Sequence, residues 1–218
     1  IPTQWTSTLM NNHALKPLYI ALLALSAPLA QAEDISQLFN DGKLILDARY
    51  RYEHVDQDNT LDHANAQTLR TRGGFQTGKW YGLSGLIEAD NTSRIGDASY
   101  NNTRNGQGNY SVVADPDGSE INQALLRYDF AQGNLVVGRQ RINLDNQRFV
   151  GGVAWRQNEQ TYDGLLGQLK PIDKLTLTYA YIDNINTIFG PGDNRFDNRT
   201  NPANIEGHSH LMNAQYVV

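Results

Sequence analysis

The stretch from Gly138 to Gly164 carries the side chains in this sequence best suited to recognising an anion. It reads GRQRINLDNQRFVGGVAWRQNEQTYDG, and its arginines are Arg139, Arg141, Arg148 and Arg156. A guanidinium group is always charged and can bind a carboxylate or a phosphate through two parallel hydrogen bonds. The surrounding glutamines and asparagines add neutral hydrogen-bonding groups. These residue types favour reversible recognition of anionic groups over covalent chemistry.

Motifs for catalysis or metal binding are weak throughout the chain. Ser209 lies between His208 and His210, but adjacent residues of a strand face opposite sides, so this adjacency does not make a catalytic pair. The chain has no cysteine, which excludes thiolate zinc sites and cysteine nucleophiles. An acidic segment from Asp56 resembles the start of a calcium loop, yet lacks its characteristic glycine and glutamate. We therefore predict no catalytic residue, no metal and no cofactor, and leave open a calcium ion in that segment.

Composition narrows the classes of protein further. The 218 residues have a formal net charge of −5, whereas nucleic-acid-binding proteins usually carry a basic excess. The hydrophobic fraction of 39% is low for a protein that spans a membrane with helices of about 20 apolar residues.

One apolar run, from Leu18 to Ala32, follows Lys16 and ends in a small-x-small pattern. This arrangement predicts a signal peptide at 10–32. Residues 1–9 would then be an upstream translation artefact, and 33–218 the exported chain.

The exported part alternates apolar and polar residues with a period of two, which is typical of β-strands with one apolar face. In Lys43–Glu53, for example, leucine and tyrosine side chains share one face and charged side chains the other. The expected strands are Lys43–Glu53, Gln67–Thr77, Trp80–Asp90, Ile121–Phe130, Leu135–Leu144, Thr161–Leu169, Leu175–Asp183 and His210–Val218. Strands of about ten residues can cross a bilayer when tilted.

The segments between these strands alternate between long and short. Transmembrane barrels show this asymmetry, with short periplasmic turns and long extracellular loops. Tyrosine, tryptophan and phenylalanine residues near both strand ends fit the two aromatic girdles of such a barrel. The sequence thus predicts an all-β, antiparallel transmembrane β-barrel. Since an open sheet edge is not tolerated in lipid, we interpret these eight strands as the N-terminal part of a larger barrel.

This pattern predicts where the arginines point. If the apolar faces contact lipid, Arg49, Arg51, Arg70, Arg72, Arg127, Arg139 and Arg141 face the lumen. The opposite assignment would cost about 2–4 kcal/mol for each arginine near the bilayer midplane. A loop from Asp145 to Gln160 would fold against the barrel through Phe149, Val150, Val153 and Trp155, and place Arg148 and Arg156 in the pore. The expected result is a net positive zone that favours anions, although arginine–acid pairs that only brace the wall remain an alternative.

The stretch at 138–164 resembles the signature of the alginate export family of outer-membrane porins. RYRYEHVDQ at 49–57, LRTRGGFQT at 69–77 and VVADPDGSEINQALLRYDF at 112–130 are similar to the same family. The resemblance implies a monomeric barrel of roughly eighteen strands with an arginine-rich lumen for an anionic polysaccharide. It carries over Arg139, Arg141, Arg148 and Arg156 as lumen or constriction residues.

The resulting hypothesis is a passive outer-membrane channel, of a Gram-negative bacterium, for anionic solutes or a polysaccharide such as alginate. Its expected partners are outer-membrane lipid, lipopolysaccharide and the solute, and the sequence leaves the oligomeric state open. The alternatives are a structural or adhesive barrel without transport and an outer-membrane hydrolase.

Overall fold

The computed structural model describes residues 34–96, 99–191 and 201–217, which lie in one compact unit, Glu33–Val218. The predicted signal peptide at 10–32 and the preceding residues 1–9 lie outside the described residues.

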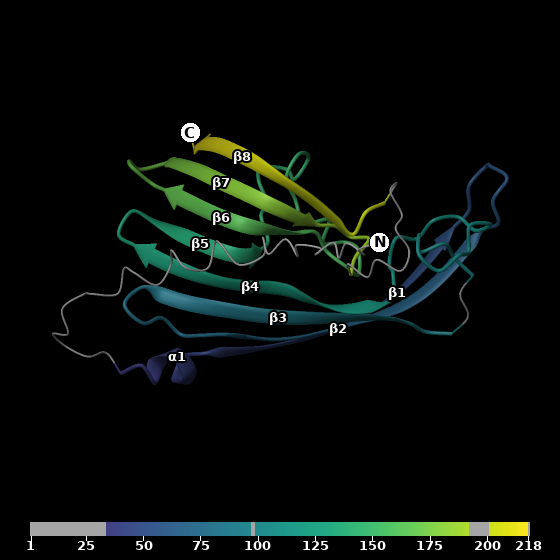
Figure 1. The fold of residues 1–218 in the computed structure, drawn as a ribbon, viewed down its shortest axis with the longest axis horizontal. Helices are drawn as coiled ribbons and strands as arrows, with labels where there is room; N and C mark the ends of the chain where they lie inside the picture. Colours follow the sequence, from purple (N-terminus) through teal and green to yellow (C-terminus); the bar gives the residue numbers. More distant parts are fainter. Residues whose placement is uncertain (1–33, 97–98, 192–200, 218) are drawn as a thin grey trace, which may run out of the picture. The chain divides into compact units, whose positions relative to one another are not determined.

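Eight strands form a single sheet in which each strand pairs antiparallel with its neighbours in sequence, as Figure 1 shows. A four-residue helix, α1 (Gln37–Asn40), precedes the sheet. The strands are β1 (Lys43–Val55), β2 (Ala64–Gln76), β3 (Leu83–Arg94), β4 (Gly118–Phe130), β5 (Gly133–Gln140), β6 (Thr161–Leu169), β7 (Leu175–Asn186) and β8 (Asn204–Tyr216). The predicted all-β fold and each of the eight expected strands are confirmed.

The strand bounds differ from expectation mainly on the side of the long connections. β5 ends at Gln140 rather than Leu144, because Leu144 instead bonds through its backbone N–H to the carbonyl of Val150. β8 begins at Asn204, six residues before the expected start, since Asn204 pairs with Asn186 of β7, which itself ends three residues later than expected. Polar residues continue both strands, so apolar alternation alone did not reveal their full length.

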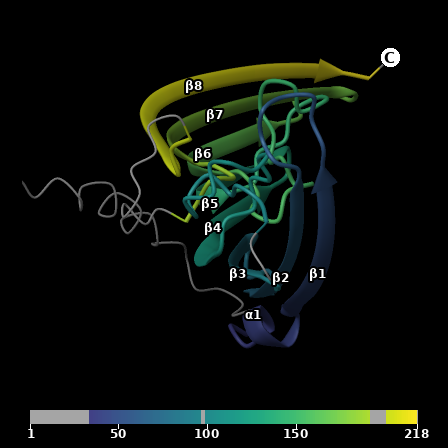
Figure 2. The same ribbon diagram turned by 90° about the vertical axis from the view of Figure 1, so that its right-hand side faces the viewer.

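The connections alternate as predicted. The short ones are 77–82, 131–132 and 170–174, and the long ones are 56–63, 95–117, 141–160 and 187–203. Because consecutive strands are antiparallel, all short connections lie at one end of the sheet and all long ones at the other. The sheet is curved, and long connections lie within its concave side (Figure 2).

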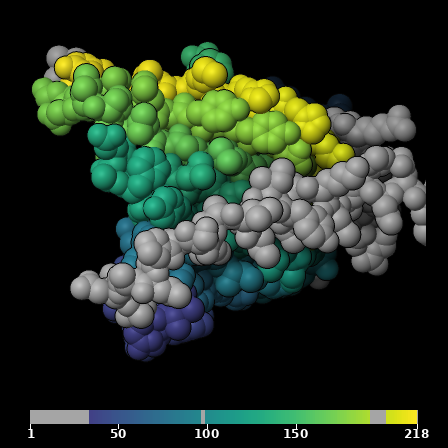
Figure 3. Space-filling view, turned by 60° about the vertical axis from the view of Figure 1, so that its left-hand side comes forward, coloured from purple at the N-terminus to yellow at the C-terminus, as the bar shows by residue number. Residues whose placement is uncertain are grey.

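The two faces of the sheet have opposite chemistry. Leu44 and Leu46 of β1 leave 71% and 76% of their surface exposed on the convex, outer face, while Thr68 and Glu88 are buried on the concave, inner face. Figure 3 views the molecule from the side of the short connections, with β6 and β7 in green and β8 in yellow. Apolar side chains outside and polar side chains inside are the pattern of a sheet whose outer face meets lipid. Within the described residues, no helix is long and apolar enough to cross a membrane.

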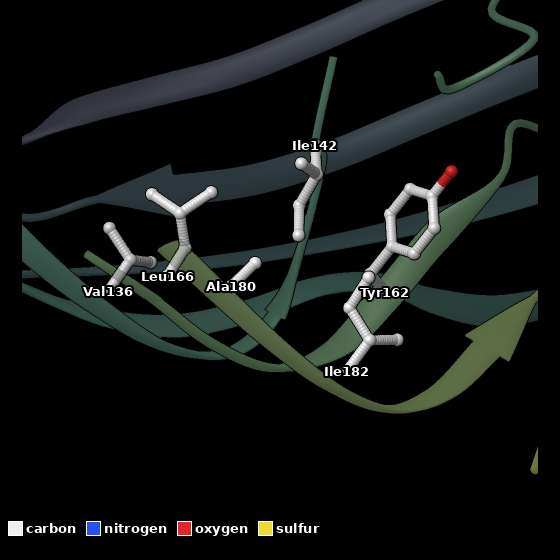
Figure 4. Packing of buried hydrophobic residues seen from close by; sticks show 6 residues of the cluster. All are labelled: Val136, Ile142, Tyr162, Leu166, Ala180 and Ile182. Atoms are coloured by element: carbon white, nitrogen blue, oxygen red, sulfur yellow. The ribbon is translucent and has the colours of Figure 1, made fainter. Parts of the chain in front are cut away.

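One part of the inner face is apolar. Val136, Leu166 and Ala180 lie side by side on β5, β6 and β7, and Ile142 packs on them from just beyond the end of β5 (Figure 4). Tyr162 and Ile182 complete this apolar cluster. It stabilises the start of the 141–160 connection against the wall.

Candidate functional site

The 141–160 connection crosses the inner face and is held there by buried polar side chains. Gln157 is fully buried, and its amide Nε2 donates to the Thr68 hydroxyl at 2.9 Å and to the carbonyls of Thr68 and Arg49 at 3.1 Å. Its backbone N–H donates to Asp115 Oδ1 at 2.9 Å. One glutamine thus joins β1, β2 and the 95–117 connection.

The predicted inward fold of this connection is present, but the predicted apolar anchors are not. Phe149 is 92% exposed and Trp155 is 59% exposed, whereas Gln157, Asn158 and Glu159 are buried. Only Val150, of the four expected anchors, packs against the apolar cluster. A polar inner face offers hydrogen-bonding partners rather than an apolar surface, so amide and carboxylate groups anchor the segment.

Glu159 is the centre of a buried charged network. Its Oε1 accepts hydrogen bonds from Arg72 Nη2 at 2.6 Å, from Arg141 Nε at 2.7 Å and from Asn122 Nδ2 at 2.6 Å. Arg72 also binds both carboxylate oxygens of Asp90. Arg141 reaches Glu88 at 2.5 Å. Strands β2, β3 and β4 are therefore linked to the inserted connection through alternating charges.

Two carboxylates in the long connections have pKa values shifted in opposite directions. For Glu159, burial favours the neutral form, but hydrogen bonding and charge from Arg141, with the charge of Arg72, outweigh it and hold the pKa below its usual value. For Asp115, burial is dominant and raises the pKa, although the Gln157 N–H and the charges of Arg156 and Arg51 oppose it. The cost of burying the charged carboxylate is therefore better compensated at Glu159 than at Asp115.

A second charged group lies beside β1. Arg156 contacts Glu53 at 3.2 Å and Asp115 at 3.8 Å, and Arg51 pairs with the same two acids. The Arg156 guanidinium lies 4.1 Å from the centre of the Trp155 ring. These cation–π and ionic contacts order the tip of the inserted connection.

Arg49 and Arg70 lie on the same inner face but differ in their partners. Arg70 pairs with Asp47 across β1 and β2. Arg49 donates to Gln157 Oε1 at 2.9 Å and to the carbonyls of Ala154 and Arg156. Among the described residues, no carboxylate lies within ion-pairing distance of Arg49. Its direct hydrogen-bond partners are neutral, and the charge of Asp115 acts on it only from a longer distance.

Three other predicted arginines lie away from this group. The strand register pairs Arg139 with exposed Ala124, on the face opposite to buried Gln140, and Arg139 binds Asp163 at 2.7 and 3.0 Å. The expectation that Arg139 faces the lumen with Arg141 therefore does not hold: β5 ends between them, so a period of two no longer relates their directions. Arg148 is exposed and lies over Phe149. Arg127 faces inward near the short connections, where it pairs with Asp129.

The arginines and acids of the inner face differ in exposure. The side chains of Arg51 and Arg141 are 20% and 29% exposed, whereas those of Glu88, Asp115 and Glu159 are at most 4% exposed. Sequence reasoning missed Asp115 and Glu159, because both lie in connections without periodicity. They balance arginine charges, so the predicted net positive zone becomes a paired network. The guanidinium side is the more accessible one at Arg51–Asp115 and at Arg141 with Glu88 and Glu159, whereas at Arg70 the partner Asp47 is the more exposed side chain, at 47% against 8%.

Comparison with known proteins identifies solved structures that share this fold. No family model and no curated protein matches the chain. Its structure is similar to Acinetobacter baumannii OccAB1, with a TM-score of 0.60 at 12% identity, over 81% of this chain and 41% of that one. It is also similar to A. baumannii OccAB3 (TM-score 0.59, 16% identity, 82% and 47%) and to Pseudomonas aeruginosa OccK9 (TM-score 0.56, 14% identity, 82% and 47%).

These neighbours are outer-membrane β-barrel porins. The eight strands have the fold of part of such a barrel. The chain spans less than half of each neighbour's length. At these identities the similarity shows the fold alone, and it does not single out the alginate export family.

Proposed function

We propose that the chain is part of an outer-membrane channel of a Gram-negative bacterium, and that anionic solutes pass along its arginine side chains without covalent chemistry. The observation that carries this proposal is the difference in exposure across the inner network. At Arg51 and Arg141 a solute meets guanidinium groups first, because the carboxylates of Asp115, Glu88 and Glu159 are buried behind them. Arg49 adds a charge that no described carboxylate pairs. Low-dielectric walls concentrate the field of such groups in a narrow pore.

A test of anion selectivity is the reversal potential of the protein in a planar bilayer across a salt gradient. Arg49→Gln removes one charge from the inner face. It should lower the anion selectivity, so the reversal potential across the salt gradient should move toward zero. The shift should be larger at low salt, since the Debye length is about 10 Å at 0.1 M and grows on dilution. Arg148→Gln is the matched control, because Arg148 is exposed on the connection and should leave the potential nearly unchanged. Equal potentials for wild type and Arg49→Gln would contradict the proposal.

An anionic polysaccharide such as alginate is the finer proposal, and the sequence resemblance supports it. A polyuronate presents one carboxylate per sugar, which suits successive guanidinium groups on the wall. Short uronate oligomers should block the current carried by small ions, while neutral oligomers of equal length should not. Equal block by both would restrict the function to small anions.

A structural or adhesive barrel is the second candidate. The number of ion pairs between the inserted connection and the wall favours it, because these pairs brace the barrel. A reconstituted protein with negligible conductance would support this candidate over a channel.

A further inference from the structure

The outer face of β5–β8 carries an apolar groove of about 700 Å³ near the short connections. Side chains around it include Leu135, Leu169, Leu177, Tyr179 and Met212, and Gly167 forms part of its floor. This volume lies within the range of about 300–1,000 Å³ that is typical of sites for small ligands. Most of an outer barrel face is covered by its own side chains, so a groove of this size needs a local cause.

The cause is the absence of a side chain at Gly167. The register aligns Leu135, Gly167 and Tyr179 across β5, β6 and β7, and continues from Tyr179 to Met212 on β8. A Cβ atom added at Gly167 would have its nearest neighbour, Leu135 Cδ1, 3.7 Å away, so the position has room for a side chain. Met212, at the far side, is 82% exposed. Across the four strands, Leu135 on one side and Tyr179 and Met212 on the other therefore flank the empty space above Gly167.

Positive charge lies next to this groove. Lys170 and Lys174 are both exposed in the connection that joins β6 and β7, directly after Leu169 and shortly before Leu177. Asp173 lies between them, and the connection has a net charge of +1. Tyr128 and Phe130, which also line the groove, are aromatic side chains of the kind found where a membrane meets water. The apolar groove thus adjoins a connection that carries two exposed lysines.

We propose that this groove binds one acyl chain of an anionic glycerophospholipid, and that Lys170 and Lys174 bind the phosphate of its head group. The proposal rests on the proposed outer-membrane location. Short connections of such barrels face the periplasm, so the groove opens to the inner leaflet, where glycerophospholipids present phosphates at this depth. Apolar burial supplies the affinity for the chain, and basic side chains at the interface select an anionic head group.

The test is native mass spectrometry of the full chain, folded in a mild detergent and titrated with palmitoyl-oleoyl phosphatidylglycerol. Gly167→Val places a strand-favouring side chain on the floor without a close contact. It excludes roughly two methylene groups of the ligand, so lipid affinity should fall about tenfold. Gly73→Val is the matched control, because Gly73 is also an outer-face strand glycine, on β2, with open space around its Cβ position.

The charge component has its own variants. Replacing Lys170 and Lys174 by glutamine should lower the affinity for phosphatidylglycerol by about fivefold per lysine. Binding of the zwitterionic phosphatidylethanolamine should change less. Lys43→Gln, an exposed lysine at the same end of β1, is the control. If the double lysine variant binds both lipids as the wild type does, the head-group assignment is wrong.

Each outcome for the groove decides the proposal. Retention of lipid by wild type and Gly73→Val, with loss in Gly167→Val, supports it. Equal lipid retention by all three proteins overturns it, and so does the absence of retained lipid on the wild type. A wild-type dimer that Gly167→Val dissociates also overturns it, because the groove would then be occupied by a second copy of the protein. If Gly167→Val does not fold, as judged by its heat-modifiable gel mobility, Leu135→Trp fills the groove from its partly exposed side. Failure of the channel proposal would appear separately, as absent conductance in a protein that still retains lipid.

Discussion

Neutralising Glu159 should release the inserted connection from the barrel wall. Glu159→Gln keeps the shape and an oxygen acceptor but removes the charge that Arg72 and Arg141 bind. A hydrogen bond to a charged group contributes about 1.5–3 kcal/mol. Arg72 retains Asp90 and Arg141 retains Glu88, so we expect a loss equal to one such bond rather than two. A loss of this size increases the population of the undocked connection about 10- to 100-fold.

The backbone amide of Gln157 reports this docking. It donates to buried Asp115, so its hydrogen can exchange with solvent only when the connection leaves the wall. Hydrogen exchange measured by mass spectrometry should be about 10- to 100-fold faster at this amide in Glu159→Gln, with β2 and β3 unchanged. Asp163→Asn is the matched control, since it also neutralises an acid paired with an arginine, Arg139, but does not touch the connection. Unchanged exchange in Glu159→Gln would refute the assignment of Glu159 as the main anchor.

Three other predictions follow from single sites. Because the pKa of Glu159 lies below its usual 4.5, its stabilisation is complete above about pH 4.5 and is lost as the pH falls through the folded-state pKa. Exchange at the same amide, corrected for intrinsic rates, should therefore accelerate in acid, and should not do so in Glu159→Gln. Burial raises the pKa of Tyr100 to about 12, and its hydroxyl has no hydrogen-bond partner among the described residues. Tyr100→Phe should therefore leave the free energy of unfolding unchanged or raise it by about 1 kcal/mol. A clear decrease would show that the hydroxyl has a stabilising partner. A cysteine at Asn59 should react with an impermeant maleimide on intact cells and one at Ile172 only after lysis; the reverse pattern would invert the orientation of the barrel.

The strands could be predicted because the two faces of the sheet have opposite chemistry. Every second residue of β1, from Leu44 to Tyr52, lies on the apolar outer face, and this constraint appears directly as a period of two. The same rule placed Arg49, Arg51, Arg70 and Arg72 on the inner face. It failed at Arg139 and Arg141, because it applies only while the chain remains a paired strand, and Gly138 marks where β5 departs from ideal geometry. Gly138 has φ +115°, and a Cβ there would lie 2.2 Å from the Ala124 carbonyl oxygen.

The partners of the arginines could not be predicted for a different reason. Glu159 meets Arg72 across 87 residues of sequence, and it does so only because a connection without periodicity folds back over the sheet. The sequence shows that carboxylates are present in the connections but not which of them is brought to the wall. The apolar side chains of 141–160 were a misleading guide, since Phe149 and Trp155 remain exposed while a glutamine and a glutamate are buried.

Polar rather than apolar side chains anchor the 141–160 connection because of the environment on each side of the sheet. In the proposed membrane location, the apolar side chains of the outer face meet lipid, so burial of more apolar surface there would not hold a connection in place. On the inner face, a connection must displace water from polar walls, and each wall group it covers needs a new partner. Gln157 and Glu159 supply such partners for Thr68 and Arg72 of β2. A connection held by charged hydrogen bonds stays docked while its network is complete, and loses about one charged hydrogen bond when Glu159 is neutralised, because Arg72 and Arg141 keep Asp90 and Glu88. The anchoring of this connection should therefore respond to pH and to single charge changes far more than the strands that support it.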